Sequence, residues 1–311
     1  MVLRHRNLHY WLYLPSSIGR SERLPLLLML HGCSQTVVEF GEGTRMNAVA
    51  EDRHCAVLYP EQSRRSNTLR CWNWFAPAVL AGKGEAALIV QSVHHIMDHY
   101  PIDPARVYVA GFSAGGAMAA VLCATHGNLF AACAIHSGVM FHAATTSLQA
   151  VQVMRRGATA SLAPIAQIMA GGHSSATRLV PTLVIHGTAD ETVNPLNAEQ
   201  FVEQTHLLAE ELDPQIPPAT LGKEKWIEEG GRRYRQQDLR QGSVLLVRSI
   251  LIDGLGHAWS GGDTGHKFFD AMGPDASQLI IEFLLPNRRP AFVVSRDAAA
   301  QSSTISSPEM L

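Results

Sequence analysis

The chain has 311 residues, of which 46% are hydrophobic and 17% are charged, and its formal net charge is −2. This composition is typical of a globular protein with a large apolar core and argues against extensive disorder. The small net charge gives no field that would concentrate nucleic acid or anionic lipid, so we expect a small or neutral partner. The short basic run 231–235 is better explained as a solvated face than as a nucleic-acid site.

The N-terminus gives no evident export signal, because no apolar stretch of signal-peptide length follows the basic residues 1–6 directly. The apolar run 24–30 is too short to span a membrane and predicts a buried strand. The five cysteines lack the close pairs that zinc and redox motifs use, so we predict no metal site. Three of them, Cys55, Cys123 and Cys133, lie in apolar surroundings and are expected to be buried thiols.

Short apolar runs predict the strands of a central sheet. The run 8–14 alternates loosely and ends at Pro15, as a half-exposed edge strand would. The later runs are continuously apolar and mostly rich in branched residues, which is typical of strands covered on both faces. These runs are 24–30, 55–59, 107–110, 131–135 and 182–185, and a last strand is expected at 244–252.

Segments of helical length and period lie between these strands, at 44–54, 85–100, 114–125 and 198–211. The alternation predicts an α/β fold in one catalytic domain, 1–286, with a mostly parallel sheet and helices on both faces. The segment 141–179 is rich in Ala, Ser and Gly and is a possible lid or substrate wall. The Ser/Ala-rich segment 287–311 is expected to be a mobile tail.

The predicted strand at 106–110 runs into Gly111-Phe112-Ser113-Ala114-Gly115 and then into an apolar helix. This strand, turn and helix match the nucleophile elbow of the α/β-hydrolase fold, in which a strained turn exposes a serine hydroxyl. Glycines two residues either side of the serine let the helix and strand approach each other closely. We therefore predict that Ser113 is a nucleophile.

A serine hydroxyl needs an imidazole to take its proton and a carboxylate to orient that imidazole. In this fold the acid and the base follow the serine in that order, each in a loop after a strand. Asp190 follows the strand 182–185 and His257 follows the strand 244–252, so they are the predicted acid and base. Glu191 and Asp253 are the alternative acids. The competing interpretation is that Glu191 is a solvated carboxylate in a turn and that Asp253 caps a turn.

The developing oxyanion needs backbone N–H donors, of which the residue after the nucleophile, Ala114, supplies one. The loop after the strand 24–30 is expected to supply the second, and Cys33 N–H is the candidate. The alternative is that Gly32 merely permits a turn. No cofactor is needed for this chemistry.

Three tryptophans, Trp72, Trp74 and Trp259, could line an acyl pocket, because aromatic walls hold apolar ester groups. The alternative is that they pack beneath the loops. His94, His95 and His99 lie on a predicted helix, but no glutamate completes a zinc-protease pattern, so a solvated helix face is the better interpretation.

Five motifs in order carry a family resemblance. They are His31-Gly32-Cys33-Ser34-Gln35, Cys71-Trp72-Asn73-Trp74-Phe75, Gly111-Phe112-Ser113-Ala114-Gly115-Gly116, His186-Gly187-Thr188-Ala189-Asp190 and Gly256-His257-Ala258-Trp259. Together they resemble the polyhydroxybutyrate depolymerase family of esterases, which is also similar to some feruloyl and acetylxylan esterases. The resemblance covers roughly residues 26–285.

The resemblance implies a secreted or periplasmic serine esterase that hydrolyses short poly- or oligo(3-hydroxybutyrate)-type esters. It also suggests a disulfide between Cys33 and Cys71 that would clamp the oxyanion loop. Family members that act on solid polymer usually carry a linker and a polymer-binding domain, which this sequence does not show. We therefore do not predict activity on insoluble polymer granules. The alternatives are a feruloyl or acetylxylan esterase and a non-catalytic binding protein with the hydrolase fold.

Overall fold

The structure is a computed structural model that describes residues 2–5, 8–16, 23–158, 179–212 and 216–289. The strands that it describes are β1 (Val2–His5), β2 (Leu8–Tyr13), β3 (Leu24–Leu30), β4 (Ala56–Glu61), β5 (Ile102–Phe112), β6 (Ala132–His136), β7 (Thr182–Gly187), β8 (Thr220–Leu221), β9 (Lys225–Glu229), β10 (Arg232–Gln241), β11 (Val244–Ile252), β12 (Trp259–Ser260) and β13 (Phe269–Asp270). The helices are α1 (Val37–Thr44), α2 (Met46–Asp52), α3 (Pro77–Leu80), α4 (Glu85–His99), α5 (Ala114–His126), α6 (Ser147–Arg156), α8 (Leu196–Leu212) and α9 (Ala276–Leu284). None of these helices has the length and apolarity needed to cross a bilayer.

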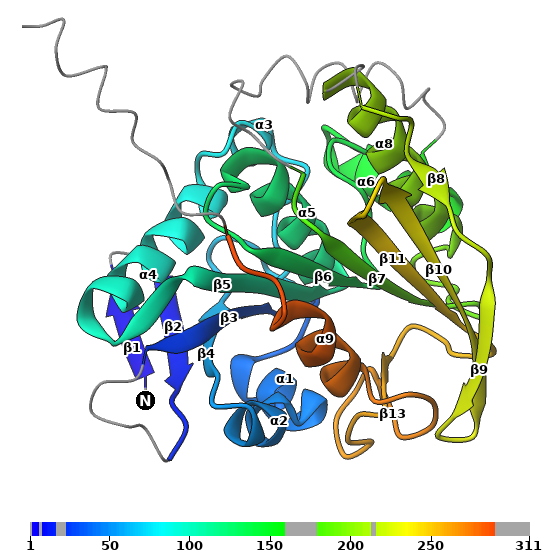
Figure 1. The fold of residues 1–311 in the computed structure, drawn as a ribbon. Helices are drawn as coiled ribbons and strands as arrows, with labels where there is room; N and C mark the ends of the chain where they lie inside the picture. Colours follow the sequence, from blue (N-terminus) through cyan, green and yellow to red (C-terminus); the bar gives the residue numbers. More distant parts are fainter. Residues whose placement is uncertain (1, 6–7, 17–22, 159–178, 213–215, 290–311) are drawn as a thin grey trace, which may run out of the picture.

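One large sheet runs through the molecule, with helices on both of its faces (Figure 1). Its strand order is β1-β2-β4-β3-β5-β6-β7-β11-β10-β8, and β9 pairs with β10. The central strands from β4 to β11 are parallel to one another, whereas the outer strands on both sides pair in antiparallel fashion. The predicted α/β fold with a mostly parallel central sheet is therefore confirmed.

The central strand β3 shows why its sequence is continuously apolar. Leu26, Leu28 and Leu30 belong to the core on one face of the sheet, together with side chains of α3, α4, α5 and α6. Leu27 and Met29 belong to the core on the other face, with α1, α2 and α9. Because both faces are covered, every residue of β3 is buried.

The structure corrects some of the predicted elements. β2 is not an edge strand, because β1 pairs with its outer side. Helix α1 was not predicted, although Thr36 and Glu39 form the reciprocal capping box at its start. The antiparallel hairpin of β9 and β10 was also missed, because its strands are rich in charged and polar residues rather than in apolar ones.

The possible lid and the predicted tail are described only in part. Within 141–179 the structure describes α6, while residues 159–178 lie outside the described residues. Residues 287–289 belong to the folded body, because Asn287 O accepts from the Tyr108 hydroxyl at 2.7 Å and Arg289 N–H donates to Ala105 O at 2.8 Å. The rest of the predicted tail, 290–311, lies outside the described residues.

The parallel strands bring four loops to one edge of the sheet. The loops begin after β3, β5, β7 and β11, and these strands run in the same direction. In open α/β sheets the carboxyl ends of parallel strands form the crevice where ligands bind. Cys33, Ser113, Asp190 and His257 lie in these four loops, and Ala114 is the first residue of α5.

Candidate active site

Ser113 occupies a strained turn between β5 and α5. Its backbone has φ 55° and ψ −119°, a conformation that residues other than glycine rarely adopt. A Cβ on Gly111 would lie 2.2 Å from the Gly115 carbonyl oxygen, and one on Gly115 would lie 2.0 Å from the Leu30 carbonyl oxygen. The two glycines therefore allow the backbone contacts that the sequence pattern predicted, and helix α5 presses against β3 and β5.

The structure brings Ser113, His257 and Asp190 into one hydrogen-bonded chain. Ser113 Oγ lies 3.0 Å from His257 Nε2, and His257 Nδ1 lies 2.7 Å from Asp190 Oδ2. These are hydrogen-bond distances, as expected between a nucleophile, its base and the acid that orients the base. Of the alternative acids, Glu191 is exposed, and the structure shows no contact of Glu191 or Asp253 with the described His257 side chain.

The Asp190 carboxylate is fully buried and accepts several hydrogen bonds. Its Oδ1 accepts from the N–H groups of Thr192 and Val193 at 2.9 and 2.8 Å, and its Oδ2 accepts from His257. His186 Nε2 lies 3.4 Å from the same Oδ2, although its short hydrogen bond, at 2.8 Å, is donated to the Val193 carbonyl oxygen. Burial disfavours the ionised carboxyl and raises its pKa. The hydrogen bonds that the carboxylate accepts outweigh this effect and hold the Asp190 pKa far below its usual range.

Aromatic rings surround the His257 imidazole. The Phe112 ring lies 4.9 Å away at a 31° tilt, and the Phe268 ring lies 6.1 Å away, edge-on. His136 is fully buried and stacks on Trp259, with ring centroids 5.0 Å apart. Burial and the nearby His186 and His257 lower the pKa of His136 to about 3, so the imidazole is neutral at physiological pH.

Sequence reasoning missed His136, His186 and Phe268 as neighbours of the candidate triad. A signal was present for His186, which lies near the end of β7, four residues before Asp190. No comparable pattern marks His136 or Phe268, because their approach to the site depends on strand order and on a long loop after β11.

The loop after β3 is fixed by buried polar contacts. His31 is fully buried; its Nδ1 lies 2.7 Å from Gly32 O, and its Nε2 accepts from Gln62 N–H at 3.1 Å. Burial lowers the pKa of His31 to about 4, which matches a neutral ring with the proton on Nδ1. The loop is also joined to the segment before Trp72 by a Cys33–Cys71 disulfide, as the resemblance suggested.

Cys33 and Ala114 present backbone N–H groups near the nucleophile turn. Ala114 is the first residue of α5, where N–H groups have no intrahelical acceptor and carry the positive end of the helix dipole. Among the described residues, the structure records no acceptor for the Cys33 or Ala114 N–H group. The assignment of these two N–H groups to an oxyanion hole stays a prediction.

The three tryptophans lie below the surface rather than on it. Trp72, Trp74 and Trp259 are only 1%, 3% and 0% exposed. Trp72 donates its indole N–H to His31 O at 3.1 Å, and Trp259 donates to Ser277 Oγ at 3.2 Å. The expectation that they line an acyl pocket therefore needs correction: fully covered indoles offer a substrate no surface, and they pack beneath the loops.

The other histidine cluster lies on α4, away from these loops. His94 and His99 are exposed, and His99 Nδ1 contacts the His95 carbonyl oxygen at 2.8 Å. Within the described part of the chain, no group of three or more His, Cys, Asp or Glu side chains could hold a metal ion.

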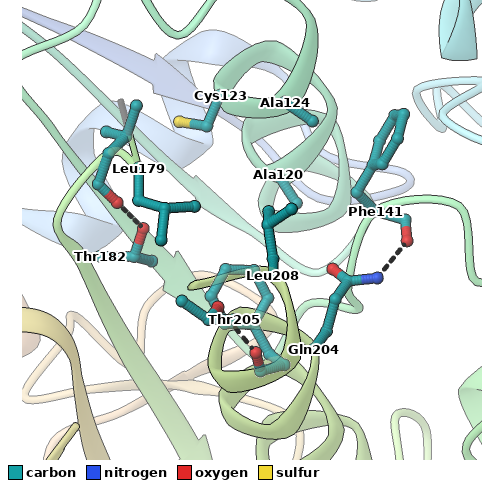
Figure 2. Close-up of a pocket in the computed structure, with 11 residues that line it drawn as sticks. Ala120, Cys123, Ala124, Phe141, Leu179, Thr182, Gln204, Thr205 and Leu208 are labelled. Atoms are coloured by element: carbon teal, nitrogen blue, oxygen red, sulfur yellow. Dashed lines mark hydrogen bonds between the residues drawn. The ribbon is translucent and has the colours of Figure 1, made fainter. Parts of the chain in front are cut away.

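A small pocket of about 50 Å³ lies between α5 and α8, and Figure 2 shows its lining. Cys123 and Ala120 come from α5, and Leu208 comes from α8. Gln204 closes one side by donating its side-chain amide to Phe141 O at 2.8 Å. The pocket contains none of the three hydrogen-bonded residues Ser113, His257 and Asp190, so it is separate from the candidate active site.

This sheet, with a serine in a strained turn beside a histidine and an aspartate, has the architecture of the α/β-hydrolase fold and the side chains of a serine hydrolase. An acetyl xylan esterase from Aspergillus awamori has a similar fold, with a TM-score of 0.71 and 20% identity over 89% of this chain and 94% of its own. The model of the family described as "Esterase PHB depolymerase" matches residues 8–215. The chain belongs to that family of carboxylic ester hydrolases.

Curated relatives differ in the esters that they are named for. Poly(3-hydroxyalkanoate) depolymerase C of Paucimonas lemoignei is 33% identical over 81% of this chain. Feruloyl esterase B of Thermothelomyces thermophilus is 28% identical over 68%, and acetylxylan esterase A of Emericella nidulans is 28% identical over 81%. The chain spans 58% of the length of the depolymerase, and 74% and 80% of the two carbohydrate esterases.

Proposed function

We propose that the chain is a serine esterase that hydrolyses short poly- or oligo(3-hydroxybutyrate)-type esters through an acyl-enzyme. The observation that carries the proposal is the alignment of Ser113 Oγ, His257 Nε2 and Nδ1, and Asp190 Oδ2 through contacts of 3.0 and 2.7 Å. Each role needs a different side chain, and all three types meet at one edge of the sheet.

In the proposed mechanism, Ser113 Oγ attacks the ester carbonyl carbon while His257 Nε2 takes the hydroxyl proton. The carbonyl oxygen becomes an oxyanion, which accepts hydrogen bonds from the Cys33 and Ala114 N–H groups. When this intermediate collapses, His257 returns the proton to the leaving alcohol, and the acyl group stays on Ser113. His257 then activates a water molecule, which releases the carboxylic acid and restores the serine. Asp190 keeps the imidazole in the required tautomer.

The proposed preference for hydroxyalkanoate esters is supported by the match to the family described as "Esterase PHB depolymerase" and by the 33% identity with the Paucimonas lemoignei depolymerase. The substrate side of the proposal is also supported by an apolar side chain, Phe268, exposed beside His257. The competing candidate is a feruloyl or acetylxylan esterase, which the 28% identical relatives support. Rates on 3-hydroxybutyrate oligomers, methyl ferulate and acetylated xylan would separate these candidates.

Replacement of Ser113 tests the mechanism. Ser113→Ala should reduce hydrolysis of p-nitrophenyl butyrate to the background rate while circular dichroism shows an unchanged fold. Ser66→Ala, which alters an exposed serine, is the matched control and should keep wild-type activity. Activity retained by Ser113→Ala would refute the assignment. An active-serine phosphonate should label the wild type only at Ser113, whereas a non-catalytic binding protein would not be labelled.

A further inference from the structure

Phe268 is an exposed aromatic residue with an unfavourable backbone. It has φ 69°, a conformation that costs free energy for a bulky side chain, and its side chain is 39% exposed. The ring therefore gains little from burial in the free protein. A strained residue of this kind persists only where its surroundings determine its conformation, and such residues are concentrated at functional sites.

The surroundings of Phe268 fix its conformation from both sides. Its carbonyl oxygen accepts from Trp259 N–H at 2.8 Å, within the pairing of β12 with β13. The next residue, Phe269, is buried so tightly against Gly43 that a Cβ on Gly43 would lie 2.3 Å from its ring. Asp270 then forms an ion pair with Arg232 at 2.7 Å. These anchors hold the Phe268 side chain at the surface instead of letting it turn inward.

The position of the ring relates it to one part of the substrate. The Phe268 and His257 ring centroids are 6.1 Å apart, with Phe268 edge-on. In the proposed mechanism, His257 Nε2 returns a proton to the oxygen of the leaving alcohol. Groups attached to that oxygen must pass close to His257, whereas the acyl carbonyl faces the Cys33 and Ala114 N–H groups. A ring beside His257 is therefore within reach of groups attached to the leaving oxygen.

We propose that Phe268 determines specificity for the alcohol part of the ester, by contact with alkyl groups on the leaving oxygen. The inference rests on the proposed function. An aromatic surface with no hydrogen-bonding group favours an alcohol that carries an aliphatic chain over one as small as methanol or ethanol. A 3-hydroxyalkanoate unit on the leaving side is an alcohol of this aliphatic class.

Two esters with the same acyl group test the proposal, because only the alcohol changes. The ratio of kcat/KM for hexyl butyrate to that for ethyl butyrate should fall about tenfold in Phe268→Gly, since one apolar contact is lost for the longer alcohol alone. Glycine tolerates the positive φ, so this variant should fold with a thermal midpoint near that of the wild type. Phe268→Tyr keeps the ring and should keep the ratio.

Leu69→Ala is the matched control at another exposed apolar side chain. Leu69 is 62% exposed, and its carbonyl oxygen accepts from Ser34 N–H at 2.7 Å, beside the oxyanion loop. This variant should leave the hexyl to ethyl ratio unchanged. An equal loss of kcat/KM on both esters in Phe268→Gly, or the same fall of the hexyl to ethyl ratio in Leu69→Ala, would overturn the inference about Phe268. Either result would leave the proposed function intact. A wild-type chain that hydrolyses neither ester would overturn the proposed function and the inference together.

Discussion

His257 Nδ1 lies 2.7 Å from Asp190 Oδ2, and the Asp190 carboxylate is buried and ionised. Asp190→Asn keeps the size of the side chain but places an amide where His257 needs an acceptor, so the imidazole adopts the other tautomer. We expect kcat for p-nitrophenyl butyrate to fall by about four orders of magnitude, with a smaller change in KM. Glu191→Gln, which changes the exposed neighbour, should leave kcat unchanged. The reverse pattern would identify Glu191 as the acid.

A second prediction concerns the contact between Gly115 and Leu30. Gly115→Ala forces a Cβ to within 2.0 Å of the Leu30 carbonyl oxygen, so backbone must move. We expect a loss of about 3 kcal/mol in the free energy of unfolding, measured with urea, and a large loss of kcat. Gly242→Ala is the control, because nothing lies within 4 Å of its Cβ position. It should cost only about 1 kcal/mol for its positive φ and leave kcat intact. Equal losses in the two variants would contradict the proposed role of the contact.

A third prediction concerns the Cys33–Cys71 disulfide, which joins residues 38 apart in sequence. Cys33→Ser/Cys71→Ser should lower the free energy of unfolding by about 2–4 kcal/mol. It should also lower kcat about tenfold, because the oxyanion donor of residue 33 is held less firmly. Dithiothreitol should have the same effects on the wild type and on Cys123→Ser, which lacks only a free thiol. If reductant changes neither stability nor kcat, the clamp has no role.

The pH dependence of stability provides a fourth prediction, through His31. Burial lowers the pKa of His31 from 6.5 to about 4. Between pH 4 and pH 6.5, His31 therefore binds a proton in the unfolded chain but not in the folded chain. Stability should therefore fall as the pH drops from 6.5 to 4, with His31 contributing about 1.4 kcal/mol per pH unit. His31→Gln should be less stable at pH 7, since it loses the contacts to Gly32 and Gln62, but its stability should fall less steeply with acid. If the free energy of unfolding falls equally steeply with acid in His31→Gln and in the wild type, His31 does not have the lowered pKa.

The parallel centre of the sheet and the candidate catalytic residues were predictable because each depends on local pattern. Buried strands must be apolar on both faces, as Leu24–Leu30 is, and a nucleophile turn needs glycines around Ser113. The order of acid and base in the fold then indicated Asp190 and His257. These signals persist in a single sequence because the chemistry and the close backbone contacts permit few other residues.

The features that sequence did not predict depend on contacts between distant segments. Trp259 is as apolar and aromatic as a pocket wall would be, and only the covering by Phe40, Phe112 and His136 makes it a buried residue. Phe268 resembles any loop phenylalanine until the anchoring of its neighbours fixes it beside His257. Burial and orientation of such residues are properties of the assembled loops rather than of the local sequence.

The approach of Gly115 to Leu30 has a consequence for redesign of the site. The strand that leads to the oxyanion loop and the turn that carries the nucleophile touch through main-chain atoms, with no side chain between them. Their relative placement is therefore independent of which side chains surround the substrate. An exposed position such as Phe268 can be exchanged to alter ester preference, while the distance between the nucleophile turn and the loop after β3 stays the same.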